Sequence, residues 1–224
     1  MPKFVIGVDE AGRGPVIGPL VMCAFAIGKE KEAELKQIGV KDSKLLEGGL
    51  RERIAKKISH HPHVIVEVSA EEITQYMRKK ISLNEMEAEK VAVAAKELAN
   101  KVDAIERIYV DSPDPVPKKF EMRIRKYLHG TKLEKVAITS ENKADYKYLC
   151  VGAASILAKS MRERRVHELA GKFGDFGSGY PSDGHTMEFL QKHFKDPELQ
   201  KYIRHNWATM KNLKTTEMKL KDFF

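Results

Sequence analysis

The sequence has few cysteines and no long apolar segment. Only two cysteines occur in 224 residues, and Cys23 and Cys150 form no Cys-x-x-Cys pair and lie among apolar neighbours. This pattern argues against a disulfide framework and predicts two buried free thiols. No apolar run is long enough to cross a bilayer, and the N-terminus lacks a basic segment followed by an apolar stretch and a cleavage site. We therefore expect a soluble, cytoplasmic protein.

A histidine pattern typical of zinc sites is also missing. His60, His61 and His63 are close in sequence, but they flank Pro62 and are expected to lie in a loop. Their spacing matches no zinc-binding pattern, so the sequence does not predict a zinc site there.

Basic residues outnumber acidic ones. Lys and Arg exceed Asp and Glu by eight, and charged residues make up 32% of the chain. A net positive charge favours a polyanionic partner, with nucleic acid the leading candidate. Many soluble proteins have a similar basic surface, so the charge alone does not decide the function. A hydrophobic content of 42% over this length suits one main domain.

Short apolar runs in the first third of the chain predict strands. Lys3–Val8 is bounded by a glycine-rich segment, and Leu20–Ile27 follows almost at once, which predicts an antiparallel pair. Val64–Val68 alternates with period two and is a third candidate strand. Charged helical segments are expected around residues 30–38 and 49–59.

The middle of the chain alternates between helical and strand patterns. Ser82 and Glu85 form a capping-box pattern before an apolar helical face over Leu83–Asn100. A strand over Ile105–Val110, ending at Asp111, follows. The next expected elements are a helix at 117–128, a strand at 136–139 and a helix at 146–169. This order predicts an α/β fold with a mixed, partly parallel sheet flanked by helices.

The expected organisation has three parts. Residues 1–170 would form the main domain, and residues 171–212 a helical C-terminal part packed on it. Residues 213–224 would form a basic, weakly anchored tail.

Four acidic residues lie where ligands bind in open α/β sheets. Asp9 and Glu10 follow the first expected strand, Asp111 ends another strand, and Asp145 begins a helix. Adjacent strand residues point to opposite faces, so we expect the strand to end between Asp9 and Glu10. The glycines that follow would supply the turn that brings both acids to one site.

Clustered carboxylates predict bound cations, because the carboxylates repel one another unless a cation compensates. Oxygen ligands favour Mg²⁺ or Mn²⁺ over zinc. Two such ions roughly 4 Å apart would activate a water and stabilise a leaving oxygen during phosphoryl displacement. The alternative is that these acids are ordinary turn and cap residues: Asp111 precedes Ser-Pro, and Asp145 is placed to cap a helix.

Several short motifs resemble those of ribonuclease HII, the type 2 ribonuclease H, in its archaeal form. The opening segment Asp9-Glu10-Ala11-Gly12-Arg13-Gly14-Pro15, with Gly18-Pro19, is similar to the family's first motif. Further motifs follow in the family's order between residues 4 and 185. These are Lys41-Asp42-Ser43-Lys44, Val110-Asp111-Ser112, Lys143-Ala144-Asp145, the segment Ala153 to Lys159, and Gly179-Tyr180-Pro181-Ser182.

The resemblance implies a ribonuclease H-like fold with a helical C-terminal part. It implies that Asp9, Glu10, Asp111 and Asp145 are catalytic and hold the metal. It also implies cleavage of the RNA strand of RNA/DNA hybrids and incision 5′ of ribonucleotides embedded in duplex DNA. Products would carry 5′-phosphate and 3′-hydroxyl ends. The related HIII type usually has an additional N-terminal domain, for which the eight residues before Asp9 leave no room, so HII is expected.

Substrate contacts are expected from residues after the acidic pair and from a later loop. Gly12-Arg13-Gly14 lets the backbone approach a ribose closely, and the resemblance assigns this segment to the 2′-hydroxyl. Tyr180, flanked by glycine and proline, is expected to stack at the RNA–DNA junction. Alone, the first segment would be an ordinary turn and Tyr180 a cover for the core edge.

Lys44 and Lys159 occupy matching motif positions and are candidates for neutralising substrate phosphates. The alternative for each is an ordinary role. Lysines are usually solvated, and the segment ending at Lys159 also has the pattern of a close-packed helix face.

The C-terminal segment from Glu217 to Phe224 resembles the peptide that binds sliding clamps of the PCNA (proliferating cell nuclear antigen) type, with glutamate in place of the usual leading glutamine. A 3₁₀ turn would place Leu220 and Phe223 on one side with Phe224 beside them. The alternative is that the two phenylalanines fold back onto the protein.

Two rival functions share part of this pattern. Another ribonuclease H-like DNA nuclease or strand-transfer enzyme would have the carboxylates but not the ribose-reading residues. A noncatalytic nucleic-acid-binding clamp adaptor would not need the complete acidic set. Ribonuclease HII is the interpretation that explains both the complete acidic set and the ribose-reading residues.

Overall fold

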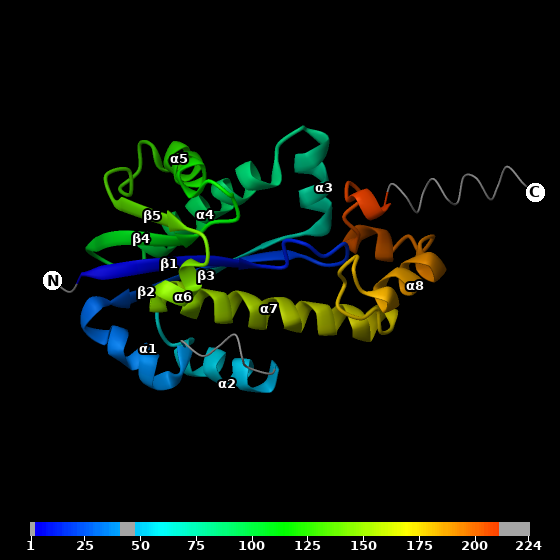
Figure 1. The fold of residues 1–224 in the computed structure, drawn as a ribbon, viewed down its shortest axis with the longest axis horizontal. Helices are drawn as coiled ribbons and strands as arrows, with labels where there is room; N and C mark the ends of the chain where they lie inside the picture. Colours follow the sequence, from blue (N-terminus) through cyan, green and yellow to red (C-terminus); the bar gives the residue numbers. More distant parts are fainter. Residues whose placement is uncertain (1–2, 41–47, 211–224) are drawn as a thin grey trace, which may run out of the picture. The chain divides into compact units, whose positions relative to one another are not determined.

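The computed structural model describes residues 3–40 and 48–210. It contains a five-stranded sheet, with strands β1 (Phe4–Ala11), β2 (Leu20–Gly28), β3 (His63–Val68), β4 (Ile105–Asp111) and β5 (Ala137–Glu141) (Figure 1). The α-helices are α1 (Glu32–Ile38), α2 (Gly48–Ile58), α3 (Ala70–Arg78), α4 (Leu83–Ala99), α5 (Pro117–Leu128), α6 (Ala144–Lys147), α7 (Leu149–Phe173) and α8 (Gly184–His193). The 3₁₀ helices η1 (Lys29–Lys31) and η3 (Leu199–Tyr202) also lie within the described residues.

The strand order of the sheet is β3-β2-β1-β4-β5. β1 pairs antiparallel with β2 and parallel with β4, and β4 pairs parallel with β5. The sheet is therefore mixed, with the parallel pairs on one side of β1. The parallel strands β1 and β4 carry acidic residues toward their carboxyl ends, which is the edge where open α/β sheets bind ligands.

β1 lies at the centre of the sheet and packs closely against α7. A Cβ added to Gly7 would lie 2.1 Å from the backbone carbon of Cys150. Glycine at this position therefore lets the strand and the start of α7 approach more closely than any other residue would permit. This contact sets how far α7 stands from the strand that carries Asp9.

Helices cover both faces of the sheet. α1, α2 and α7 lie on one side, and α4 and α5 lie on the other (Figure 1). The first face is packed by apolar residues of β1, β2, α1, α2 and α7, such as Val5, Phe25, Leu35, Ile58 and Ile156. On the other side, Tyr127 of α5 donates a 2.7 Å hydrogen bond to Glu85 of α4.

The chain divides into two compact units. The first comprises Met1–Ala11, Val21–Glu67 and Asn84–Met161, as far as these residues are described, and it contains nearly all of the sheet. The second comprises Gly12–Leu20, Val68–Leu83 and the described residues from Arg162 to Met210. Its core is formed by apolar residues that include Ile17, Leu169, Phe176 and Ile203. Ile17 and Ile203 form an isolated antiparallel bridge within it.

The predicted fold class is confirmed: a mixed sheet is flanked by helices. The two cysteines are buried free thiols, as predicted. No helix among residues 3–40 and 48–210 is both long and apolar enough to cross a membrane. Two expectations about the helices differ from the structure. The helix expected at 146–169 is divided into α6 and α7, and α3 was not predicted.

Candidate active site

Asp9 is a buried carboxylate near the end of β1. Its side chain has 5% of its surface exposed, and its backbone lies opposite Cys23 in β2. One of its oxygens, Oδ1, accepts a 2.7 Å hydrogen bond from the backbone N–H of Glu10. A buried carboxylate at a strand end is costly unless a charge or hydrogen bonds compensate it, so its surroundings indicate its role.

Asp111 and Asp145 are brought together by a hydrogen bond. Asp111 is the last residue of β4, and its Oδ1 accepts a 2.7 Å hydrogen bond from the backbone N–H of Ala144. Ala144 is the first residue of α6, and Asp145 is the second. The N-cap residue Lys143 has φ +58° and ψ +38°, a left-handed conformation that few residues other than glycine adopt. This local turn places the start of α6 beside Asp111.

Like charges and burial raise the pKa of Asp9 to about 7. Burial has the largest effect, and the Asp111 carboxylate adds to it, with a smaller contribution from Asp145. The Ser155 hydroxyl and the Lys159 ammonium offset part of this rise. Three of the four predicted carboxylates are therefore close enough to act on one another, and together they form an electronegative site in the first unit.

The strand does not end between Asp9 and Glu10, contrary to our expectation. β1 continues through Ala11, and Glu10 pairs with Met22 in β2. Because successive residues of a regular strand point to opposite faces, the side chains of Asp9 and Glu10 leave β1 on opposite faces. Interstrand pairing with β2 extends the strand to the glycine. The place of Glu10 in the acidic set thus rests on the sequence resemblance.

The donor set fits a hard divalent cation. The three associated groups supply carboxylate oxygens only, which is the ligand chemistry of Mg²⁺ and Mn²⁺. Burial, with repulsion from Asp111 and Asp145, raises the pKa of Asp9, and a cation among these groups would favour the charged form again.

The Gly12-Arg13-Gly14 segment belongs to the second unit. Gly12 has φ +85°, and a Cβ at this position would lie 2.6 Å from Arg162 Cδ and 2.8 Å from the Pro19 carbonyl oxygen. Both the left-handed conformation and the lack of space require glycine here.

Arg204 holds this glycine-rich segment through its backbone carbonyls. Its guanidinium is fully buried and donates to the carbonyl oxygens of Gly12 at 2.7 Å, Arg13 at 2.9 Å and Gly18 at 3.0 Å. Trp207 Nε1 donates to the Gly14 carbonyl oxygen over 3.0 Å. Burial, with the charge of Arg162, lowers the pKa of Arg204 to about 9, so the side chain stays charged at neutral pH.

Tyr180 lies against the same segment. A Cβ added to Gly14 would be 3.1 Å from Tyr180 Cε1. The Arg162 guanidinium carbon lies 5.2 Å from the centre of the tyrosine ring, a cation–π distance, and Arg162 Nη2 donates to the Ser178 carbonyl oxygen over 3.0 Å. Tyr180 and the Gly12-Arg13-Gly14 segment, which were predicted separately as substrate contacts, therefore lie next to each other in the structure.

The Tyr180 loop is fixed by Asp183 at the start of α8. Asp183 Oδ2 accepts hydrogen bonds from the backbone N–H and the hydroxyl of Ser178, at 2.8 and 2.7 Å. These bonds lower the pKa of Asp183 to about 2. The loop conformation is thus set by a partly exposed carboxylate that remains ionised over the physiological pH range.

Comparison with known proteins identifies the family. A family model described as ribonuclease HII matches residues 6–210. The chain belongs to the ribonuclease HII family. Ribonuclease HII of Methanocaldococcus jannaschii is 42% identical over 219 residues, which cover 94% of each chain. The predicted resemblance is confirmed, and the chain is an endoribonuclease.

Solved structures of ribonuclease HII proteins have the same fold. The crystal structure of ribonuclease H2 from Pyrococcus horikoshii OT3 has a TM-score of 0.84 at 40% identity and covers 95% of this chain and 98% of its own. The structure of the PCNA:RNase HII complex from Archaeoglobus fulgidus has a TM-score of 0.81 at 38% identity, covering 93% and 96%.

Of the remaining predicted site residues, the structure describes Lys159 only. Lys159 lies in α7 near Asp9, as its effect on the pKa of Asp9 indicates. Lys44 and the clamp motif Glu217, Leu220, Phe223 and Phe224 lie outside the described residues.

Sequence reasoning missed three residues that organise the glycine-rich segment: Arg162, Arg204 and Trp207. Trp207 is the single tryptophan of the chain, which is a weak signal. No local pattern indicates that Arg204 is buried, because its hydrogen-bond acceptors lie more than 180 residues earlier in the chain.

Proposed function

We propose that this ribonuclease HII hydrolyses the RNA strand of RNA/DNA hybrids and incises duplex DNA on the 5′ side of embedded ribonucleotides. Hydrolysis would leave 5′-phosphate and 3′-hydroxyl ends. The observation that carries this proposal is the grouping of three carboxylates at the ends of neighbouring strands. Asp9 is buried near the end of β1, and Asp111, at the end of the adjacent strand β4, binds the start of the helix that carries Asp145. Repelling carboxylates at the ends of strands are a ready site for divalent cations.

Asp9, Glu10, Asp111 and Asp145 would hold two Mg²⁺ or Mn²⁺ ions. The chemistry that such bound ions supply is activation of a water nucleophile and stabilisation of the leaving oxygen. The chain positions the ligands: the hydrogen bond from Ala144 to Asp111 holds one carboxylate against the turn that presents Asp145. Lys159, whose charge already acts on Asp9, supplies positive charge beside the carboxylates.

Selection of a ribonucleotide would come from the glycine-rich segment. Its carbonyl groups are engaged by Arg204 and Trp207, which fixes the backbone before substrate arrives. A rigid backbone without side chains at Gly12 and Gly14 can approach a 2′-hydroxyl closely. Tyr180, held against Gly14 and Arg162, offers an aromatic face for a sugar or base.

A duplex with one embedded ribonucleotide tests this function. The full chain with Mg²⁺ or Mn²⁺ should cut that strand once, on the 5′ side of the ribonucleotide, and the downstream fragment should carry a 5′-phosphate. An all-DNA duplex of the same sequence should remain intact. Equal cleavage of the two duplexes would instead support a ribonuclease H-like DNA nuclease.

The acidic site is tested separately by Asp111→Asn. This change keeps the shape of the side chain and removes one negative charge, so it should abolish metal-dependent cleavage while leaving hybrid binding measurable. Full activity in this variant would contradict the proposed ligand set.

The C-terminal segment is a proposed docking peptide for a sliding clamp. The support is the resemblance of residues 217–224 to clamp-binding peptides and the structural likeness to the ribonuclease HII of the Archaeoglobus fulgidus complex with PCNA. A short peptide that inserts apolar side chains into a groove is a common recognition mode.

A further inference from the structure

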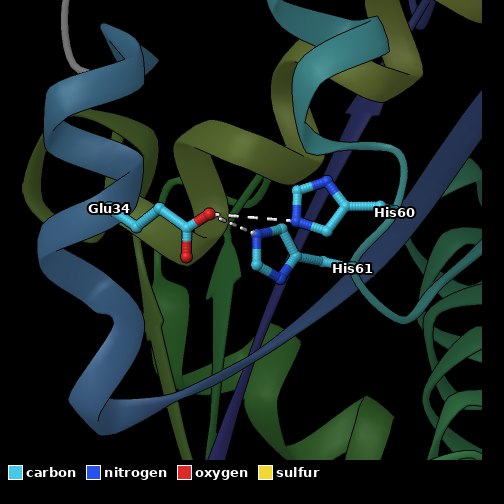
Figure 2. A group of neighbouring side chains, drawn as sticks. All are labelled: Glu34, His60 and His61. Carbon is cyan, nitrogen blue, oxygen red and sulfur yellow. Dashed lines mark ion pairs between the residues drawn. The ribbon is translucent and has the colours of Figure 1, made fainter.

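Glu34, His60 and His61 form a cluster that the sequence did not predict. Glu34 lies in α1, and the two histidines lie in the turn between α2 and β3. The three side chains point toward one another (Figure 2). The Nε2 atoms of His60 and His61 lie 3.8 and 3.9 Å from Glu34 Oε1. All three residues belong to the first unit.

The His60 ring has the orientation typical of a metal-ligating histidine, with one nitrogen bound to a carbonyl and the other directed at the cluster. Its Nδ1 lies 2.7 Å from the Lys57 carbonyl oxygen, and because a carbonyl only accepts hydrogen bonds, Nδ1 carries the proton. In the neutral ring Nε2 therefore presents its lone pair toward Glu34. Metal-binding histidines typically donate their other ring N–H to a carbonyl or carboxylate in this way. Two acceptors that face each other are brought together by a positive charge between them, which is supplied either by a proton on the imidazole or by a bound metal ion.

His61 supplies an independent observation. Its side chain has 7% of its surface exposed, and its buried Nε2 has no hydrogen-bond partner within the described residues. An unsatisfied buried polar atom is costly in free energy. Burial and the neighbouring His60 lower the pKa of His61, which favours the neutral, metal-binding form. The rings of Phe25 and His61 pack edge to face, with their centres 5.5 Å apart.

We propose that Glu34, His60 and His61 bind a divalent transition-metal ion of the zinc class. Two imidazole nitrogens and one carboxylate oxygen are a donor set that suits Zn²⁺ and leaves a position for water. With metal–ligand distances near 2.0–2.1 Å, donors in a tetrahedral site lie about 3.4 Å apart. The observed 3.8 and 3.9 Å therefore require the donors to close by about half an ångström.

The side chains can make this adjustment. Glu34 has 43% and His60 61% of its side-chain surface exposed, so both can rotate toward the buried His61 without disturbing the core. Their exposure also gives an ion direct access from solvent. An ion bound here would join α1 to the turn that leads into β3.

This site is distinct from the carboxylate site. The backbone N–H of Ala26, near the end of β2, donates to the carbonyl oxygen of Pro62, the residue after His61. Phe4 pairs with Gly28, so the end of β2 lies beside the beginning of β1, whereas Asp9 lies toward the other end of β1. The two sites also differ in donors, because the carboxylate site offers oxygen only. Excess Mg²⁺ should therefore occupy one site and not the other.

The experiment uses untagged full-length protein, stripped of metal and then titrated with Co²⁺ in excess Mg²⁺. We expect one equivalent of Co²⁺ to bind with visible d–d absorption of a four- or five-coordinate ion, and Zn²⁺ to abolish that absorption. Glu34→Gln and His60→Ala, both at exposed side chains, should lose the absorption or weaken Co²⁺ binding about tenfold or more. Melting curves should show a Zn²⁺-dependent increase of about 5 °C in the wild type but not in these variants.

Two control variants separate this site from other metal-binding groups. His129 forms an exposed pair with Glu134, at 2.7 Å, so His129→Ala removes a histidine paired with a single glutamate. Asp111→Asn disables the carboxylate site. Both variants should keep the Co²⁺ absorption. Absence of the absorption in the wild type, its survival in His60→Ala, or its loss in Asp111→Asn would overturn the proposal.

Discussion

The Arg204 guanidinium donates a 2.7 Å hydrogen bond from Nη2 to the carbonyl oxygen of Gly12. The arginine is fully buried and also binds the carbonyl oxygens of Arg13 and Gly18. A residue close to the C-terminal end of the described chain therefore fixes the segment that directly follows the acidic pair. If the glycine-rich segment binds the ribonucleotide as proposed, Arg204 is a positioning residue for substrate recognition.

Arg204→Lys should weaken hybrid binding more than it slows the chemical step. Lysine keeps the positive charge but lacks the planar group that reaches three carbonyl oxygens at once. We expect a loss of about 2 kcal/mol in the free energy of unfolding, measured with urea. KM for a hybrid should rise at least severalfold with a smaller change in kcat.

Arg165→Lys is the matched control, because Arg165 forms an exposed pair with Glu168 in α7. Its stability and KM should stay close to the wild-type values. If Arg204→Lys reduced only kcat, or affected neither constant, a positioning role would be ruled out.

Gly12→Ala should disrupt the same segment from within. The substitution combines a left-handed backbone, at φ +85°, with a Cβ 2.8 Å from the Pro19 carbonyl oxygen. We expect hybrid cleavage at low substrate concentration to fall by about tenfold or more, because small displacements of positioning groups are costly. Cleavage should be measured under single-turnover conditions.

Gly130→Ala isolates the backbone effect. Gly130 has φ +71°, but a Cβ there meets nothing within 4 Å. This variant should lose only about 1 kcal/mol of stability from the left-handed conformation and should retain activity. Equal activity losses in the two variants would show that crowding at Gly12 is unimportant.

Deletion of residues 217–224 should abolish association with a sliding clamp and leave nuclease activity unchanged. The deleted segment contains the clamp-like motif and none of the four proposed catalytic carboxylates. Binding should be measured by calorimetry with a purified archaeal clamp, and activity on a hybrid without the clamp. Replacing Leu220 and Phe223 with alanine should reproduce the binding loss, because these apolar side chains would fill the clamp pocket. Unaltered clamp affinity after the deletion would disprove the docking role.

Local patterns in the sequence predict most of the fold. Strands and helices such as β4 and α5 begin and end within a residue or two of the apolar patterns that predict them. Helix α3 also had a signal, since Ser69 and Glu72 form a capping-box pattern, and Ser69 Oγ accepts from the Glu72 N–H at 3.0 Å. This helix could therefore have been predicted from the sequence.

What the sequence could not predict depends on long-range contacts. The continuation of β1 past Asp9 is set by pairing with β2, which outweighs the glycine-rich pattern that follows. The N–H of Ala144 is bound by a carboxylate 33 residues earlier in the chain. The Glu34, His60 and His61 cluster likewise forms only when α1 packs beside the turn before β3.

Asp9→Asn should stabilise the metal-free protein at high pH. The pKa of Asp9 is raised from 3.8 to about 7 in the folded state, so the folded protein holds a proton that the unfolded chain releases near pH 4. The contribution of Asp9 to the stability should therefore fall as pH rises from about 4 to about 7, by an amount on the order of 4 kcal/mol, and stay low above that range. Asparagine carries no charge, so Asp9→Asn should not lose this stability as pH rises. In the presence of a chelator, urea unfolding should show similar stability for the two proteins at pH 4 and a more stable variant at pH 8.

Divalent metal should make the wild type more stable than Asp9→Asn at pH 8. A cation among Asp9, Asp111 and Asp145 compensates the charge on Asp9, so Mg²⁺ at pH 8 should stabilise the wild type and have a smaller effect on Asp9→Asn. Asp103→Asn, at an exposed carboxylate, should match the wild type under both conditions. A stability difference between Asp9→Asn and the wild type that does not grow between pH 4 and pH 8 without metal would contradict the cost of the buried Asp9 charge on which the proposed metal site depends. The comparison therefore tests, without any measurement of activity, whether a divalent cation compensates the charge of Asp9 in the folded protein.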